Sequence, residues 1–195
     1  ALILPVLVLL LFGAIELARY VLFNQKLESV TSIAADAIAR WDTDVATCAN
    51  LGYGAYGAVM VWGMQPTYDF ANNGAMIVSA VEHRAVGING HELVVVWQSK
   101  WPQGAGYASR VGNVGQAPTG SSWPSHFNAT PGSVMFIGDR AVVVEVFYRY
   151  DYFLNSFGFT DGVSYKRSIF RPRFGKLGQL QSGCGACDAS RGACG

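Results

Sequence analysis

The chain has 195 residues and a formal net charge of +1, so its composition gives no electrostatic argument for binding nucleic acid. Charged residues make up only 14% of the chain, whereas about a quarter is usual in soluble proteins. Glycine occurs 23 times and aromatic residues reach 13%. A chain of this composition buries much of its own surface, or packs against copies of itself and against partners.

The N-terminal segment is strongly apolar. Its first fifteen residues carry no charge, and Glu16 ends the run. A membrane-spanning helix needs about 20 mainly apolar residues, so this run approaches a span without establishing one. It also lacks the basic start and small-residue cleavage site of a secretory signal peptide. We therefore expect that residues upstream are missing or processed off and that the helix is retained. The alternative is a helix buried in the core of the domain.

The helical pattern continues past Glu16 to about Trp41, with apolar residues at helical spacing. Forty helical residues would be roughly 60 Å long. We expect residues 1–23 to form the membrane half of this stalk helix and residues 24–48 to form the half that carries a domain. Pro5 is expected to kink the membrane half, because proline removes one helical hydrogen bond.

Residues 49–176 predict an α+β domain in which an antiparallel sheet of about four strands packs on the long helix. Residues 76–83 and 93–98 read as strands, and Asn89-Gly90 between them is typical of a hairpin turn. Residues 141–153 alternate most clearly: one face is expected to be core, and the other carries a possible charge ladder. That ladder consists of Glu145, Arg149 and Asp151. Residues 163–171 predict the last strand.

A loop of about thirty residues, from residue 99 to residue 131, is too long for an ordinary connection between strands. Aromatic residues crowd this region, namely Trp97, Trp101, Tyr107, Trp123 and Phe127. Three interpretations stay open. The aromatics form a satellite core that holds the loop down, they form an interface between subunits, or they bind a glycan.

Four cysteines are present, Cys48, Cys184, Cys187 and Cys194, and three of them lie in a Gly-rich tail, residues 177–195. A tail without a core needs cross-links to order it, and disulfides persist in oxidising compartments. We expect one tail cysteine to pair with Cys48, although the sequence does not choose among the three possible pairings. A zinc site made of all four cysteines, suggested by the spacing of Cys184 and Cys187, and free thiols are the alternatives.

No catalytic site and no cofactor site is predicted. The three histidines are His83, His91 and His126. The first two flank the predicted hairpin and can approach one another across it. They are interpreted either as metal ligands or as ordinary surface residues. A basic stretch runs from residue 166 to residue 176. It is interpreted either as a docking surface for acidic partners or lipid headgroups, or as charges that protect an edge strand from aggregation.

Four segments in this order resemble the TadE-like family of minor pilins (pseudopilins), which belongs to the tight-adherence, or Flp-type, pilus machinery of bacteria. They are ALILPVLVLLLFGAIELARY at the N-terminus, DFANNGAMIVSAV at 69–81, VVVEVFYRYDYF at 142–153 and SIFRPRFG at 168–175. The resemblance thus spans about residues 1–175. The aromatic loop 97–127 and the cysteine tail depart from the family pattern.

The resemblance implies a pilin-like, non-enzymatic subunit that acts in the assembly, initiation or tip capping of a pilus. It places the chain in the bacterial inner membrane with its C-terminal domain outside the cytoplasm, or on a cell-surface pilus. The implied partners are other pilins or pseudopilins, membrane proteins of pilus assembly, and lipid. The candidate residues for helix packing and assembly are Pro5, Gly13, Glu16 and Arg19. Small residues such as Gly13 let helices approach closely, and Glu16 can pair with Arg19 three residues later.

The alternative function is that of an adhesin, tethered to the membrane or to a fibre, that binds a surface glycan or protein receptor through the aromatic loop. No nucleic-acid partner is expected.

Overall fold

The computed structural model describes residues 3–40, 45–46, 68–87, 90–101, 106–118, 123, 135–152, 162–173 and 179–180. Within these residues there is one long helix and a short one, α1 (Ile3–Ala39) and α5 (Phe70–Asn73). The strands are β1 (Val45–Ala46), β2 (Gly74–Val86), β3 (Gly90–Trp101), β4 (Arg140–Tyr150), β5 (Gly162–Phe170) and β6 (Gln179–Leu180).

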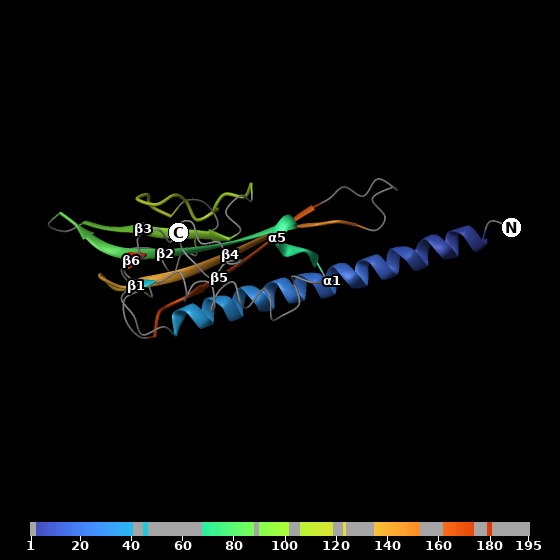
Figure 1. Cartoon of the computed structure of the whole chain (residues 1–195), viewed down its shortest axis with the longest axis horizontal. Helices are drawn as coiled ribbons and strands as arrows, with labels where there is room; N and C mark the ends of the chain where they lie inside the picture. The colour runs from blue at the N-terminus through green and yellow to red at the C-terminus, as the bar shows by residue number, and fades with distance from the viewer. Residues whose placement is uncertain are drawn as a thin grey trace.

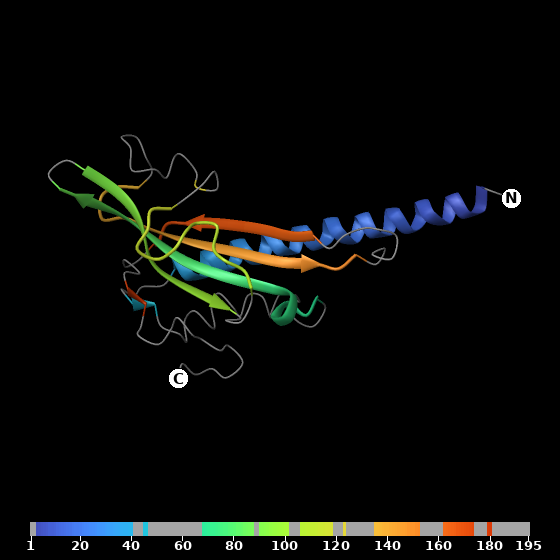
Figure 2. The ribbon, with the colours of Figure 1, turned by 90° about the horizontal axis from the view of Figure 1, so that it is seen from above.

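Four of the strands form one antiparallel sheet in the order β3-β2-β4-β5. Helix α1 lies along one face of this sheet with its C-terminal half and extends far beyond the sheet with its N-terminal half (Figures 1 and 2). The predicted α+β fold, a long N-terminal helix on an antiparallel sheet of four strands, is confirmed. The predicted hairpin is also present, because β2 pairs with β3 from Met76 opposite Trp101 to Val86 opposite Gly90. Gly87 in its turn has φ +65°, a conformation that favours glycine.

Helix α1 runs through 37 residues without interruption, which corresponds to a length of about 55 Å. Pro5 does not interrupt this helix, and the kink expected there stays a prediction. The boundary predicted after residue 23 and the other predicted domain limits remain predictions.

The main core lies between α1 and the sheet. Phe23, Leu27 and Val30 of the helix are fully buried against alternate residues of β4, as the alternation of that strand predicted. The β4 residues of this core are Val142, Val144, Val146, Tyr148 and Tyr150.

A second core covers the opposite face of the sheet. It joins Val81, Val95 and Val143 of the sheet to Val111 and Met135, which come from the connecting segments. The expected charge ladder on this face is therefore wrong. Glu145 is fully buried and hydrogen-bonded to the segment 106–118, and Arg149 faces Asn73 instead.

A pair of short parallel strands, which was not predicted, joins the beginning and the end of the domain sequence. Strand β1 pairs with β6, with Val45 opposite Gln179 and Ala46 opposite Leu180. Two residues are too few to produce a recognisable alternation, so a sequence pattern cannot reveal such a pair.

Candidate functional site

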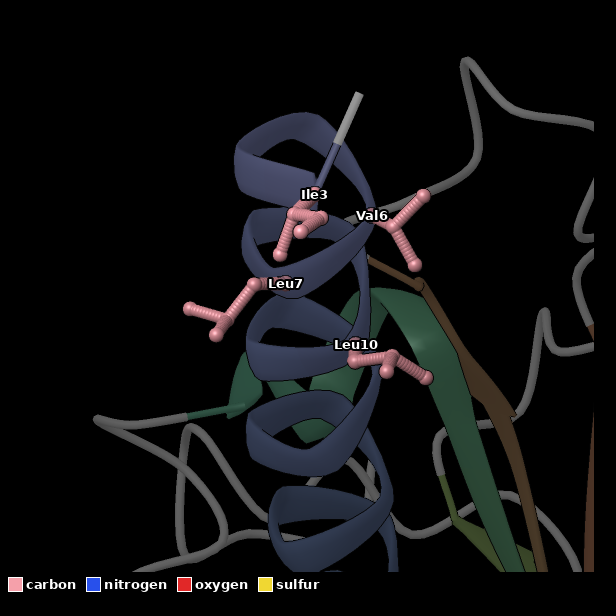
Figure 3. Close-up of a pocket in the computed structure, with 4 residues that line it drawn as sticks. All are labelled: Ile3, Val6, Leu7 and Leu10. Atoms are coloured by element: carbon pink, nitrogen blue, oxygen red, sulfur yellow. The ribbon is translucent and has the colours of Figure 1, made fainter. Parts of the chain in front are cut away.

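The N-terminal third of α1, from Ile3 to Ile15, is an apolar rod whose described side chains are mostly exposed. Its side chains point away from the helix axis, as Ile3, Val6, Leu7 and Leu10 do in Figure 3. Ile3 is 81% exposed and Leu10 is 67% exposed, and no described side chain from Ile3 to Ile15 is buried. Such a surface is stable only in lipid or against other apolar helices.

The segment Val6–Ala39 is long and apolar enough to cross a membrane. A buried core helix passes the same test, but only 11% of the most apolar window of this helix is buried. A signal sequence passes it too. Here, however, the same helix continues without a break into the core, where Phe23 and Leu27 are fully buried. Removing the helix would open the core, so the structure favours a helix that is retained.

Glu16 lies at the point where α1 first meets the domain. Its Oε2 atom is 3.6 Å from Nη1 of Arg19, one turn later, so the two predicted residues are paired. Glu16 is 8% exposed whereas the Arg19 side chain is 53% exposed. The guanidinium therefore reaches outward while the carboxylate faces the sheet, next to Tyr150. Burial and, after it, the negative charge of Glu16 raise the pKa of Tyr150 to about 12.

Tyrosines surround this junction. Tyr20 of the helix contacts Tyr150 and Tyr152 at ring distances of 5.5 and 5.9 Å. One turn further along α1, Phe23 packs on Tyr148 and Tyr150 at 4.8 and 4.9 Å. Aromatic side chains with a polar tip suit a position between an apolar and an aqueous region. The tyrosine junction, which we define as Tyr20, Tyr150 and Tyr152, thus marks where the apolar rod meets the domain.

Gly13 lies on the apolar rod and has no packing role within the described structure. A Cβ atom added there would meet nothing within 4 Å. Glycine at this position is therefore not required by the fold of the chain itself. Pro5 belongs to the same rod, but its side chain lies outside what the structure describes.

The predicted basic stretch is largely neutralised within the chain. Lys166 pairs with Glu28 at 3.2 Å and Arg173 with Asp36 at 3.0 Å, so both join β5 and its extension to α1. Arg171 pairs with Asp139 at 2.7 Å. These contacts give the charges an internal role: they fasten the helix and a neighbouring turn to the edge of the sheet.

The structure places the predicted aromatic loop residues in different locations. Trp97 and Trp101 belong to β3 rather than to a loop, and both are buried in the main core, where Trp101 stacks on Phe70. Tyr107 stacks on Phe147 at 5.4 Å, and Trp123 packs on the second core. These positions favour the interpretation that the aromatics hold the chain against the domain. Phe127 lies outside the described residues.

Glu145 is a structural residue whose role the sequence pattern did not reveal. Its carboxylate accepts hydrogen bonds from the Ser109 hydroxyl, from the Arg110 backbone N–H at 2.9 Å and from the Tyr165 hydroxyl at 2.9 Å. A lone acid between apolar residues on both sides is the signal that points to a buried, paired carboxylate.

The four cysteines lie outside the described residues, so the predicted disulfides remain predictions. Among the residues that the structure describes, no group of three or more His, Cys, Asp or Glu side chains is arranged to hold a metal ion.

Comparison with known proteins adds one finding. Residues 1–36 match the family model described as TadE-like protein. No curated protein and no solved structure matches the chain. The match covers nearly the whole of α1 and none of the four-stranded sheet, so the resemblance of the segments 69–81, 142–153 and 168–175 remains a prediction. Over its N-terminal helix, the chain thus matches the TadE-like protein family, as the first of the four segments predicted.

Proposed function

We propose that the chain is a minor pilin or pseudopilin, anchored by α1 in the bacterial inner membrane, with its sheet domain outside the cytoplasm. Its role is structural: it takes part in the assembly, initiation or tip capping of a pilus. The division of α1 into an apolar rod and a half packed on the sheet is the observation that carries this proposal. The TadE-like match over residues 1–36 supports it independently.

The same apolar rod serves both states that such a subunit passes through. In the membrane, lipid covers Ile3 to Ile15. In a fibre, the helices of neighbouring pilins cover the same residues, and Gly13 allows their backbones to approach closely. Partner recognition along the rod then depends on shape rather than on charge, because residues 1–15 carry no charged side chain.

The test replaces the chain in its host by variants and measures three properties separately. Membrane fractionation reports anchoring, a C-terminal alkaline phosphatase fusion reports which side of the membrane the domain occupies, and electron microscopy reports pilus number and length. Deletion should give fewer pili, and those that remain should have normal length if the subunit initiates or caps fibres.

Gly13→Leu separates assembly from anchoring. The added side chain has room within the chain, so the protein should still fold and enter the membrane, but the number of pili should fall because close helix packing is blocked. Val114→Leu, at an exposed position outside the helix, is the control. The proposal fails if deletion leaves both the number and the length of pili unchanged, or if the intact chain fractionates as a soluble protein.

A further inference from the structure

The hairpin of β2 and β3 turns at the end of the sheet that lies far from the apolar rod (Figures 1 and 2), and two histidines meet close to this turn. His83 is on β2, and His91 is on β3 opposite Ala85, so the two are diagonal neighbours across the hairpin. Their ring centroids are 5.7 Å apart, with the planes nearly perpendicular at 82°. The expectation that they approach one another is confirmed.

His83 is held rigidly. Its backbone N–H donates to the Asp139 carbonyl at 2.9 Å, and its own carbonyl accepts from the Gly138 N–H at 2.7 Å. In addition, its ring Nδ1 lies 3.0 Å from the carbonyl oxygen of Met135. Three bonds thus fix both the backbone and the ring of a residue that is only 5% exposed.

This arrangement determines the tautomer of His83. A carbonyl oxygen can only accept, so Nδ1 must carry the proton that it donates to Met135. In the neutral ring, Nε2 then carries no proton and can only accept a hydrogen bond or bind a metal. That Nε2 atom is buried and has no hydrogen-bond partner among the described residues. A buried acceptor without a donor is unfavourable unless a ligand completes it.

We propose that His83 and His91 form a binding site for a divalent transition metal of the Zn²⁺ class, with Nε2 of His83 as the fixed ligand. Neutral imidazole nitrogens suit zinc, copper and nickel. A metal-bound histidine commonly donates its second ring N–H to a backbone carbonyl, as His83 does to Met135. Two imidazoles on one tetrahedral zinc, with Zn–N distances of about 2.0–2.1 Å, place their ring centres roughly 5–6 Å apart.

His91 supplies the adjustable ligand. It is exposed at the start of β3, so its ring can turn about its side-chain bonds until a nitrogen faces Nε2 of His83. Because the described residues offer no third side chain of this kind, water or a group from outside them would complete the coordination. We therefore expect a moderate affinity that depends on both histidines equally.

Zinc titration of the full chain tests this proposal. The chain is purified in detergent without a histidine tag, and its cysteines are reduced and alkylated so that thiolates contribute nothing. Isothermal titration with ZnCl₂ should give about one Zn²⁺ per chain, and the affinity should fall by at least about tenfold when either histidine is replaced. Electron paramagnetic resonance with Cu²⁺ should show nitrogen ligands in the same proteins.

The variants are chosen to preserve the fold. His83→Asn keeps a side-chain N–H near the position of Nδ1, and with it the bond to Met135, but removes the Nε2 ligand. His91→Ala changes an exposed residue. Glu92→Gln is the control, since this neighbouring carboxylate is bound to Arg84 at 2.5 Å. The proposal is overturned if the wild-type chain shows no saturable binding, or if binding survives both histidine substitutions.

Discussion

Glu145 is predicted to hold the segment 106–118 on the sheet, and its replacement tests this directly. In Glu145→Ala three donors lose their common acceptor: the Ser109 hydroxyl, the Arg110 N–H and the Tyr165 hydroxyl. Hydrogen bonds to a charged group contribute about 1.5–3 kcal/mol each, but they are not additive within one network. A buried donor left without an acceptor costs about 1–3 kcal/mol, so we expect a total loss of about 3–5 kcal/mol.

Glu145→Gln should be milder, with a loss of about 1–2 kcal/mol, because the amide keeps one acceptor oxygen for the Arg110 N–H and the Tyr165 hydroxyl. Glu28→Ala is the control: this carboxylate is 69% exposed in its pair with Lys166, so its removal should change stability by less than about 1 kcal/mol. Urea unfolding of the full chain in detergent measures all three variants.

Hydrogen exchange gives the local readout. The Arg110 amide should lose its protection in Glu145→Ala, while the Val95 amide, which donates to Gln116 at 2.9 Å, reports whether the second attachment of the segment survives. A loss below about 1 kcal/mol together with unchanged exchange at Arg110 would refute the assigned role of Glu145.

Two further predictions concern the contact between α1 and the sheet. Phe23→Ala should lower the free energy of unfolding by about 3–5 kcal/mol, because the ring is fully buried; Leu22→Ala, at a position 58% exposed, is the control, and equal losses would contradict this assignment. Burial, and after it the charges of Asp151 and Asp69, raise the pKa of Tyr148 to about 12. The protonated tyrosine is therefore favoured in the folded state, so its stabilising effect is complete below the ordinary pKa near 10 and is lost as the pH rises towards about 12. Urea midpoints measured across this range should fall less steeply in Tyr148→Phe than in the wild type, and parallel curves would exclude Tyr148 as the cause.

Local patterns predicted the regular elements well. The Asn-Gly turn identified the hairpin, and the alternation around Val144 identified the core face of β4, because both depend on neighbours within a few residues. The end of β3 was missed although its signal was present. Every second side chain at this end of the strand is buried, namely those of Trp97, Ser99 and Trp101. The strand therefore continues three residues beyond its predicted end at residue 98.

Contacts between distant segments were beyond the reach of such patterns. Glu145 and Ser109 are 36 residues apart. The apolar neighbours of Glu145 indicate a buried carboxylate, but no local pattern identifies the loop residues that donate to it. The same holds for the orientation of Glu16 and Arg19. The sequence identified Glu16 and Arg19 as a pair, but only the structure shows that the carboxylate turns inward, towards the sheet, while the guanidinium turns outward.

The two sides of α1 differ in how far their apolar surface extends, and this constrains how the proposed anchor sits in a bilayer. On the side away from the sheet, exposed apolar residues continue to Leu22 and polar ones follow from Gln25. Twenty residues from Ile3 to Leu22 span about 30 Å, the thickness of the hydrocarbon core. On the side facing the sheet, the domain already covers the helix at Glu16.

If the membrane boundary is flat, lipid can cover the far side of the helix down to Leu22 only if the end of the sheet near Glu16 enters the interfacial region. The residues found there fit that depth, because Tyr20 and Tyr152 are partly exposed aromatics with polar tips and Arg19 extends outward. The tyrosine junction therefore lies at headgroup level when the apolar rod is in lipid. In the fibre that we propose, neighbouring helices would have to cover Leu17, Val21 and Leu22 as well as the rod, so the contact with partners would continue past Glu16 on one side of the helix only.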